Sequence, residues 1–197
     1  MKPIVLLDVD GVICNFTKLY LRCAKRVGVL PPDFDEEWHP DSWNIGDALN
    51  LTVDGRTAVW KLLAKSGAAS DGIEAYEGAV AGVKEIMLLG VDVYFPTASF
   101  EASPTWEYDR RAWFREHFSK EVADRLIFTQ HKHVVHGDVL VDDKLENILS
   151  WQQTQKRGRK LGGILWPHTY NINPPVDVFR AEHRDWSWLH SVVKRLV

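Results

Sequence analysis

The sequence predicts an α/β fold in which helices cover both faces of a mostly parallel sheet. Short apolar runs typical of buried strands alternate with segments of helical periodicity, and polar residues directly follow several of those runs. The chain has 197 residues, enough for one compact domain with a small insertion. Residues 17–76 interrupt the alternation and are the expected insertion.

Composition narrows the class of protein. Hydrophobic residues make up 45% and charged residues 26%, a balance that excludes disorder, collagen-like repeats and coiled coil. The net charge of −3 gives no attraction to nucleic acid, and no apolar run approaches the roughly 20 residues of a membrane span. The only cysteines, Cys14 and Cys23, indicate a reducing compartment. We therefore expect a cytoplasmic protein with no nucleic acid polymer or membrane as partner, and a homodimer stays open.

The first expected elements are a strand at 4–7 and a helix at 14–27. The strand is continuously apolar and ends in polar residues, which is typical of burial on both faces of a sheet. The helix carries its apolar residues on one face. The region that follows contains several prolines and an acidic stretch at 33–37, and its pattern predicts only one clear helix, near 56–65. We expect a catalytic core formed by 1–16 and 77–197, with a small, mostly helical cap at 17–76.

Regular alternation resumes after residue 77. Ser103 and Pro104 predict a helix start as N-cap and first turn, and Lys156 and Arg157 suit a helix end near Gly158. Further strands are expected at 91–95, 126–128, 139–141 and 163–166. Further helices are expected at 79–89, 103–118, 145–158 and 186–196.

Polar residues follow four of the expected strands. Each is compatible with an ordinary turn when it is taken alone, but parallel strands bring their carboxyl ends to one edge of the sheet. Adjacent carboxylates repel each other unless a cation lies beside them, and carboxylate oxygens suit Mg²⁺. The set predicts a cation site next to a phosphate site. In chain order its members are Asp8, Asp10, Thr97, Lys132, Asp142 and Asp143.

The order of these residues distinguishes two families with similar parts. In receiver domains the acidic pair comes early and the phosphorylated Asp follows on a later strand. The order found here resembles the haloacid dehalogenase (HAD) superfamily of phosphatases. Within it, the chain is similar to the 5'(3')-deoxyribonucleotidases. The segments that carry this resemblance are 8–16, 77–85, 93–97, 127–135 and 137–144.

Three positions depart from the pattern of that family. Ala98 follows Thr97 where the family usually has Ser, and Gln130 stands where it often has Arg. Small residues at 66–70 replace an aromatic-rich stretch of the cap. The first departure concerns phosphate binding, and the other two concern the identity of the nucleotide.

The resemblance implies a HAD-type core and a mechanism through an aspartyl-phosphate. Asp8 would attack phosphorus, and Asp10 would protonate the leaving alkoxide and then deprotonate the attacking water. Mg²⁺ would be held by Asp8, the backbone carbonyl of Asp10, and Asp142. Thr97, the Ala98 N–H and Lys132 would hold phosphate oxygens, with Asp143 supporting them. The expected substrates are nucleoside 5'-monophosphates, particularly deoxyribonucleotides, bound by Phe16, Trp43, Trp60 and Gln130.

Two alternative functions stay open. One is a HAD phosphatase for another small phosphoester, such as a sugar phosphate. The other is a silent phosphate-binding protein, against which the full set of candidate catalytic residues argues. A zinc site at His131, His133 and His136 is not favoured, because their spacing does not converge and no Cys lies nearby. Trp106 is expected to pack in the core, and Tyr170 is expected at the catalytic edge.

Overall fold

The computed structural model describes residues 2–65, 67, 72–155 and 162–197. The predicted helix end at 156–158 and most of the 66–70 stretch lie outside these residues. Five strands form one sheet in the order β3-β2-β1-β4-β5, and every pair is parallel. This confirms the predicted α/β class. The strands are β1 (Ile4–Leu7), β2 (Asp92–Thr97), β3 (Leu126–Phe128), β4 (Val139–Asp142) and β5 (Gly162–Leu165).

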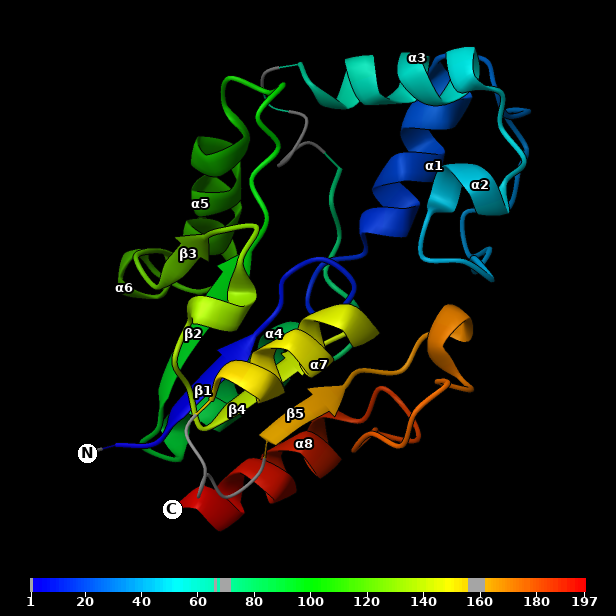
Figure 1. Cartoon of the computed structure of the whole chain (residues 1–197). Helices are drawn as coiled ribbons and strands as arrows, with labels where there is room; N and C mark the ends of the chain where they lie inside the picture. The colour runs from blue at the N-terminus through cyan, green and yellow to red at the C-terminus, as the bar shows by residue number, and fades with distance from the viewer. Residues whose placement is uncertain (1, 66, 68–71, 156–161) are drawn as a thin grey trace.

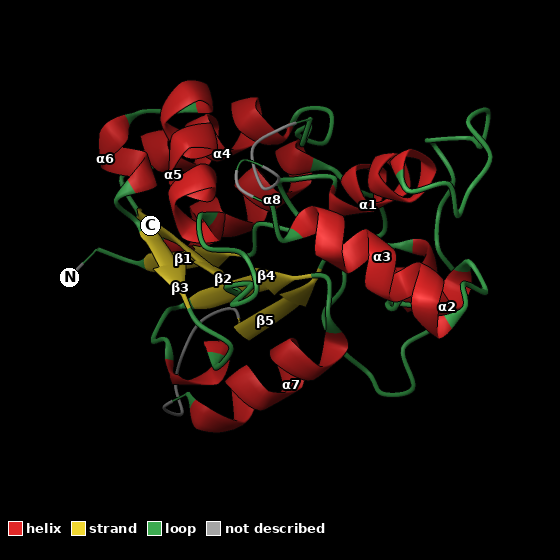
Figure 2. Cartoon of the chain, turned by 90° about the horizontal axis from the view of Figure 1, so that it is seen from above, coloured by secondary structure: helices red, strands yellow, loops and turns green. Residues whose placement is uncertain are grey.

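Helices cover both faces of the sheet, as Figure 2 shows. One face carries α4 (Ala79–Leu88), α5 (Trp106–His117) and α8 (Trp186–Val193), and the other carries α7 (Leu145–Thr154). Alternate residues of a strand point to opposite faces, so Leu6 packs with Trp151 of α7 while Val5 and Leu7 join the larger core on the other side. This two-sided burial explains why the strands are continuously apolar.

The segment after β1 forms three helices beyond the carboxyl ends of the strands (Figure 1). They are α1 (Phe16–Arg26), α2 (Ile45–Ala48) and α3 (Val53–Leu63), and α1 packs against α3. Their position over the strand ends is the one expected of a helical cap, although the division at 16/17 and 76/77 stays a prediction. No helix in the described ranges has both the length and the apolar character that a membrane span needs.

One local expectation was wrong, and two short helices were not predicted. The Ser103–Pro104 pair does not start α5, because the helix begins at Trp106 after Thr105, whose hydroxyl donates to Asp109 within the first turn instead of capping the backbone. Ser103 itself is buried, and its hydroxyl has no hydrogen-bond partner among the residues that the structure describes. The sequence also gave no indication of α2 and α6 (Lys120–Ala123), because a single helical turn is too short to show periodicity.

Candidate active site

The loop after β1 is shaped by Gly11. Asp8 still belongs to the sheet through its N–H, which donates to the Val141 carbonyl at 2.9 Å. Gly11 follows with φ +84°, a region that favours glycine. A Cβ at this position would lie 2.3 Å from a carboxylate oxygen of Asp143. Glycine therefore provides both the turn and the close approach of this loop to the end of β4.

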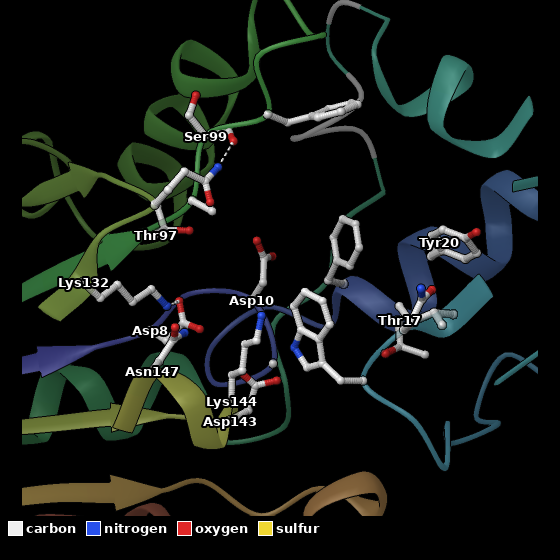
Figure 3. A pocket seen from close by; sticks show the side chains of 18 of the residues that line it. Asp8, Asp10, Thr17, Tyr20, Thr97, Ser99, Lys132, Asp143, Lys144 and Asn147 are labelled. Atoms are coloured by element: carbon white, nitrogen blue, oxygen red, sulfur yellow. Dashed lines mark hydrogen bonds and ion pairs between the residues drawn. The ribbon is translucent and has the colours of Figure 1, made fainter. Parts of the chain in front are cut away.

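One pocket of about 430 Å³ lies where β1, β2, β3 and β4 end. It is bordered by every predicted site residue except Asp142, which is fully buried behind the wall. Figure 3 shows Asp8 and Lys132 together on one side, with Asp10 pointing into the open space. The predicted residues that line it are Asp8, Asp10, Phe16, Trp43, Trp60, Thr97, Ala98, Gln130, Lys132 and Asp143.

A buried charge cluster forms the floor of the pocket. Lys132 Nζ lies 2.6 Å from Asp8 Oδ1 and 2.7 Å from Asp142 Oδ2. Burial opposes the charge of Lys132, but the two carboxylates outweigh it and raise the pKa of the ammonium. Burial raises the pKa of Asp8 well above its usual value, against the opposing effect of Lys132. Burial and the charge of Asp142 raise the pKa of Asp143 to about 7.

The same cluster fits a divalent cation. Asp8, Asp142 and Asp143 each offer a carboxylate oxygen, and these oxygens lie within 4.8 Å of one another. Lys132 pairs with two of these three buried carboxylates, and the charge of all three in their ionised form exceeds that of the lysine, so a bound cation would favour their ionisation. Oxygen-only donors suit a hard cation such as Mg²⁺. The predicted metal ligands were Asp8, Asp142 and the backbone carbonyl of Asp10. The carboxylate cluster of the structure contains Asp8 and Asp142, and its third member is the side chain of Asp143.

Three side chains outside the predicted site residues hold Asp142 and Asp143 in place. Asn147, in the first turn of α7, donates its amide to both oxygens of Asp142 at 3.0 and 3.1 Å. The Tyr170 hydroxyl donates to Asp143 Oδ2, and Asn171 donates to the Asp143 carbonyl at 2.8 Å. Tyr170 was expected at this edge. The place of Asn147, shortly after the Asp142–Asp143 pair, was the available signal for its role.

The phosphate side of the pocket departs from the family pattern as the sequence indicated. Thr97 ends β2 and is buried, and Ala98 follows it in the pocket wall. Ser99 does not take the place of the missing Ser, because its hydroxyl donates to Glu107 at 3.0 Å. Gln130 donates its amide to the Ser99 carbonyl at 2.8 Å, which leaves its oxygen to meet a ligand.

Aromatic rings form the outer wall. Phe16 of α1 and Trp60 of α3 lie 6.1 Å apart between ring centroids, and the ring centroid of Trp60 lies 5.2 Å from that of Phe100. Phe100 lies in the connection between β2 and α5, Trp106 is the first residue of α5, and neither was predicted as a site residue. Trp106 is buried, as expected, and also lines the pocket. Trp43 is half exposed beneath Lys144, whose Nζ lies 3.7 Å from its ring centroid.

Comparison with known proteins agrees with this geometry. The sequence model of the family described as 5' nucleotidase, deoxy (pyrimidine), cytosolic type C protein matches residues 2–195. The chain belongs to this family. Its members are phosphatases, and the chain is therefore an enzyme of the phosphoric monoester hydrolase class.

Individual relatives are distant. The cytosolic-type 5'(3')-deoxyribonucleotidase of Homo sapiens is 29% identical over 146 residues, covering 71% of this chain and 70% of that protein. The mitochondrial enzyme of Mus musculus is 27% identical, covering 71% and 64%. A HAD family hydrolase of Deinococcus radiodurans, solved with bound phosphate and sodium, has a TM-score of 0.56 at 13% identity and covers 99% of this chain and 96% of that one. The structural likeness shows that the fold is the HAD fold.

The raised pKa of Asp143 makes stability depend on pH. In the folded, metal-stripped protein this carboxyl keeps its proton up to about pH 7, whereas an unfolded Asp loses it near 3.8. The unfolded state then binds fewer protons, so the free energy of unfolding falls as pH rises across that range. We expect the stability of the metal-stripped wild type, relative to that of Asp143→Asn, to fall between about pH 4 and 7 in urea unfolding.

The wild type is compared with Asp143→Asn because His168 makes the opposite contribution to the pH dependence of the free energy of unfolding. Burial and Arg184 lower its pKa to about 3, so its contribution is lost as pH falls below 6.5. That contribution is common to both proteins and cancels. A difference that does not vary with pH would show that Asp143 is not held protonated in the folded state.

Proposed function

We propose that this enzyme hydrolyses nucleoside 5'-monophosphates, deoxyribonucleotides in particular, with Mg²⁺ and through an aspartyl-phosphate on Asp8. The observation that carries the proposal is the shape of the pocket. Its floor brings Asp8, Asp10 and Lys132 together, and its outer wall consists of aromatic rings. Such a pocket suits a substrate with a phosphate at one end and a planar base at the other.

The reaction divides into two displacements. First a carboxylate oxygen of Asp8 attacks phosphorus, the bond from phosphorus to the ester oxygen breaks, and Asp10 gives its proton to the leaving alkoxide. Water then attacks the phosphorus of the aspartyl-phosphate while Asp10 takes its proton, and the bond from phosphorus to the Asp8 oxygen breaks. Inorganic phosphate leaves, and both carboxyl groups return to their starting state.

Charge on the transferring group is stabilised by residues at the strand ends. Lys132 lies between Asp8 and Asp142, from which it can reach phosphate oxygens. The Thr97 hydroxyl and the Ala98 N–H would bind the others. Asp8, Asp142 and Asp143 would hold Mg²⁺, which supplies charge stabilisation to the phosphoryl group when it is bound. Asn147 and Tyr170 keep the carboxylates aligned for it.

The aromatic wall supports a nucleotide as substrate. Stacking on aromatic side chains contributes about 1–3 kcal/mol per base, but it tolerates any base. Discrimination must come from hydrogen bonds to the base edge and from pocket size. The side-chain oxygen of Gln130, whose amide donates to the Ser99 carbonyl, borders the pocket and would suit such a contact. We expect pyrimidine deoxynucleotides to be favoured only weakly.

Replacing Phe16 separates base recognition from chemistry. Phe16→Ala is expected to raise KM for nucleotides by roughly ten-fold, because a stacking face is lost. The KM for p-nitrophenyl phosphate, which has no base, is expected to change little. Steady-state kinetics on both substrates measures this. Equal losses on the two substrates would assign Phe16 to the fold rather than to the base.

A panel of phosphoesters tests the proposed function. Phosphate release is measured from deoxyribonucleotides, ribonucleotides, sugar phosphates and p-nitrophenyl phosphate, with Mg²⁺ and with a chelator. We expect the highest kcat/KM on a deoxyribonucleotide and no turnover with the chelator. Faster turnover of a sugar phosphate than of any nucleotide would contradict the nucleotidase proposal, and no turnover of any phosphoester would favour a binding protein.

We also propose a cytoplasmic location, which the two free, buried cysteines support. The relatives in other organisms include both a cytosolic and a mitochondrial type. Fractionation of the source cells with an antibody to this chain tests the proposal. Recovery in a compartment other than the cytoplasm would contradict it.

A further inference from the structure

A buried arginine lies against the candidate acid–base residue. Arg110 of α5 is completely buried, and its Nη2 donates to Asp10 Oδ1 at 2.6 Å. Its guanidinium lies 4.9 Å from the ring centroid of Trp106. Within the described part of the chain, Nε and Nη1 of Arg110 have no hydrogen-bond partner. Asp10 is therefore the carboxylate that balances this charge.

The neighbouring acid, Asp109, does not share this role. It is buried as well, but its Oδ2 accepts from the Thr105 hydroxyl at 2.7 Å and from the Gly67 N–H at 2.9 Å. These two contacts direct the carboxylate of Asp109 toward the start of α5. The pairing of Arg110 with Asp10 is thus a specific contact between α5 and the loop after β1.

Folding stability does not account for such an arrangement. A buried guanidinium with one ion pair and two unfilled donors pays a large desolvation cost. Replacing buried ion pairs by apolar side chains is often neutral or stabilising. The contact does, however, fix one end of the Asp10 side chain, which is 29% exposed and points into the pocket (Figure 3).

We propose that Arg110 is a positioning residue for Asp10. By holding Oδ1, it leaves Oδ2 facing the pocket, where the ester oxygen of the substrate has to receive a proton. Proton transfer depends on this orientation, because a displaced carboxyl cannot reach the leaving oxygen. The inference rests on the acid–base role given to Asp10 in the proposed function. It gives α5, which carries none of the predicted motifs, a part in the reaction.

The test compares leaving groups. A deoxynucleotide releases an alkoxide that needs a proton, whereas p-nitrophenyl phosphate releases a phenolate that does not. The quantity to compare is kcat/KM, which covers the steps up to the aspartyl-phosphate and excludes its hydrolysis. Arg110→Met is expected to lower kcat/KM on the order of 100-fold for the deoxynucleotide and to change it little for p-nitrophenyl phosphate. Arg110→Lys, which keeps the charge, is expected to recover part of the loss.

Two comparisons distinguish positioning from a structural role. Arg111→Met is the matched control, because Arg111 follows on the same helix but lies over Phe128 and donates to the Ala123 carbonyl at 2.9 Å. Arg111→Met is expected to leave unchanged the ratio of kcat/KM for the deoxynucleotide to kcat/KM for p-nitrophenyl phosphate. In an Asp10→Asn background, Arg110→Met is expected to add no further loss. Equal losses on both substrates, or additive losses in that background, would overturn the inference.

Failure of the proposed function gives a different result. If the wild type hydrolyses p-nitrophenyl phosphate and an alkyl phosphate but no nucleotide, the nucleotide proposal fails and the alkyl–aryl ratio still tests Arg110. A crystal structure of Arg110→Met provides a readout that does not depend on turnover. We expect Asp10 to leave its single orientation there, and an unchanged Asp10 rotamer would overturn the inference.

Discussion

Asp8→Asn is expected to abolish turnover on every phosphoester. An amide neither attacks phosphorus nor contributes negative charge to the cation site, so kcat should fall by roughly 10³-fold or more, as when a covalent nucleophile is removed. The phospho-enzyme that acid quenching of the wild type should trap is expected to be absent from the variant. Phosphate release and intact-protein mass spectrometry measure the two effects.

A matched control is Asp124→Asn. Asp124 is an exposed carboxylate at the end of α6, where it pairs with Lys120, and it does not border the pocket. Its replacement is expected to leave kcat unchanged. Residual activity above a few per cent in Asp8→Asn, once deamidation has been excluded by mass, would remove Asp8 from the role of nucleophile.

Asp142→Asn is expected to have the second largest effect, through loss of the metal. Asp142 is completely buried and accepts from Lys132, Asn147 and the Lys144 N–H. Replacing it removes a charge from the cation site, and we expect the Kd for Mg²⁺ to rise roughly 10- to 100-fold, with turnover lost at millimolar Mg²⁺. Calorimetric titration of Mg²⁺ into the purified variants measures the change.

Asp10→Asn is the comparison for that experiment. Its carboxylate points into the pocket and lies outside the acidic cluster, so we expect turnover to fall while Mg²⁺ affinity stays close to that of the wild type. An equal loss of Mg²⁺ affinity in both variants would contradict this division between the two aspartates.

The sequence predicted the sheet and the residues at its carboxyl edge because both depend on local patterns. The apolar runs of β1 and β4 can be recognised directly, and the polar residues that follow them must meet once the strands are parallel. The role of Arg110 could not be predicted in the same way. On an amphipathic helix a charged residue is usually exposed, and only the tertiary packing of α5 against the loop after β1 buries it beside Asp10.

The aromatic wall of the pocket could also be predicted only in part from local sequence patterns. Phe16 and Trp60 were assigned to the pocket because they resemble family residues of the first motif and of the cap. Phe100 comes shortly after β2 but belongs to none of the segments that carry the resemblance, so nothing in the sequence marked it. Its contact with Trp60 joins segments distant in the sequence, and no periodicity encodes such a contact. Short helices such as α2 and α6 were missed for a related reason, since one turn leaves no repeat to detect.

The central position of β1 also determines when the protein can fold. Ile4 pairs with Asp92 and Val5 with Val139, so β1 can be paired along both edges only after residue 139 has been synthesised. Pairings of such long sequence separation are slow, because loop closure precedes the contacts that stabilise it. Until then β1 exposes an apolar edge that favours aggregation. The nascent chain therefore carries an incompletely paired β1 throughout the synthesis of the segment that ends in β4.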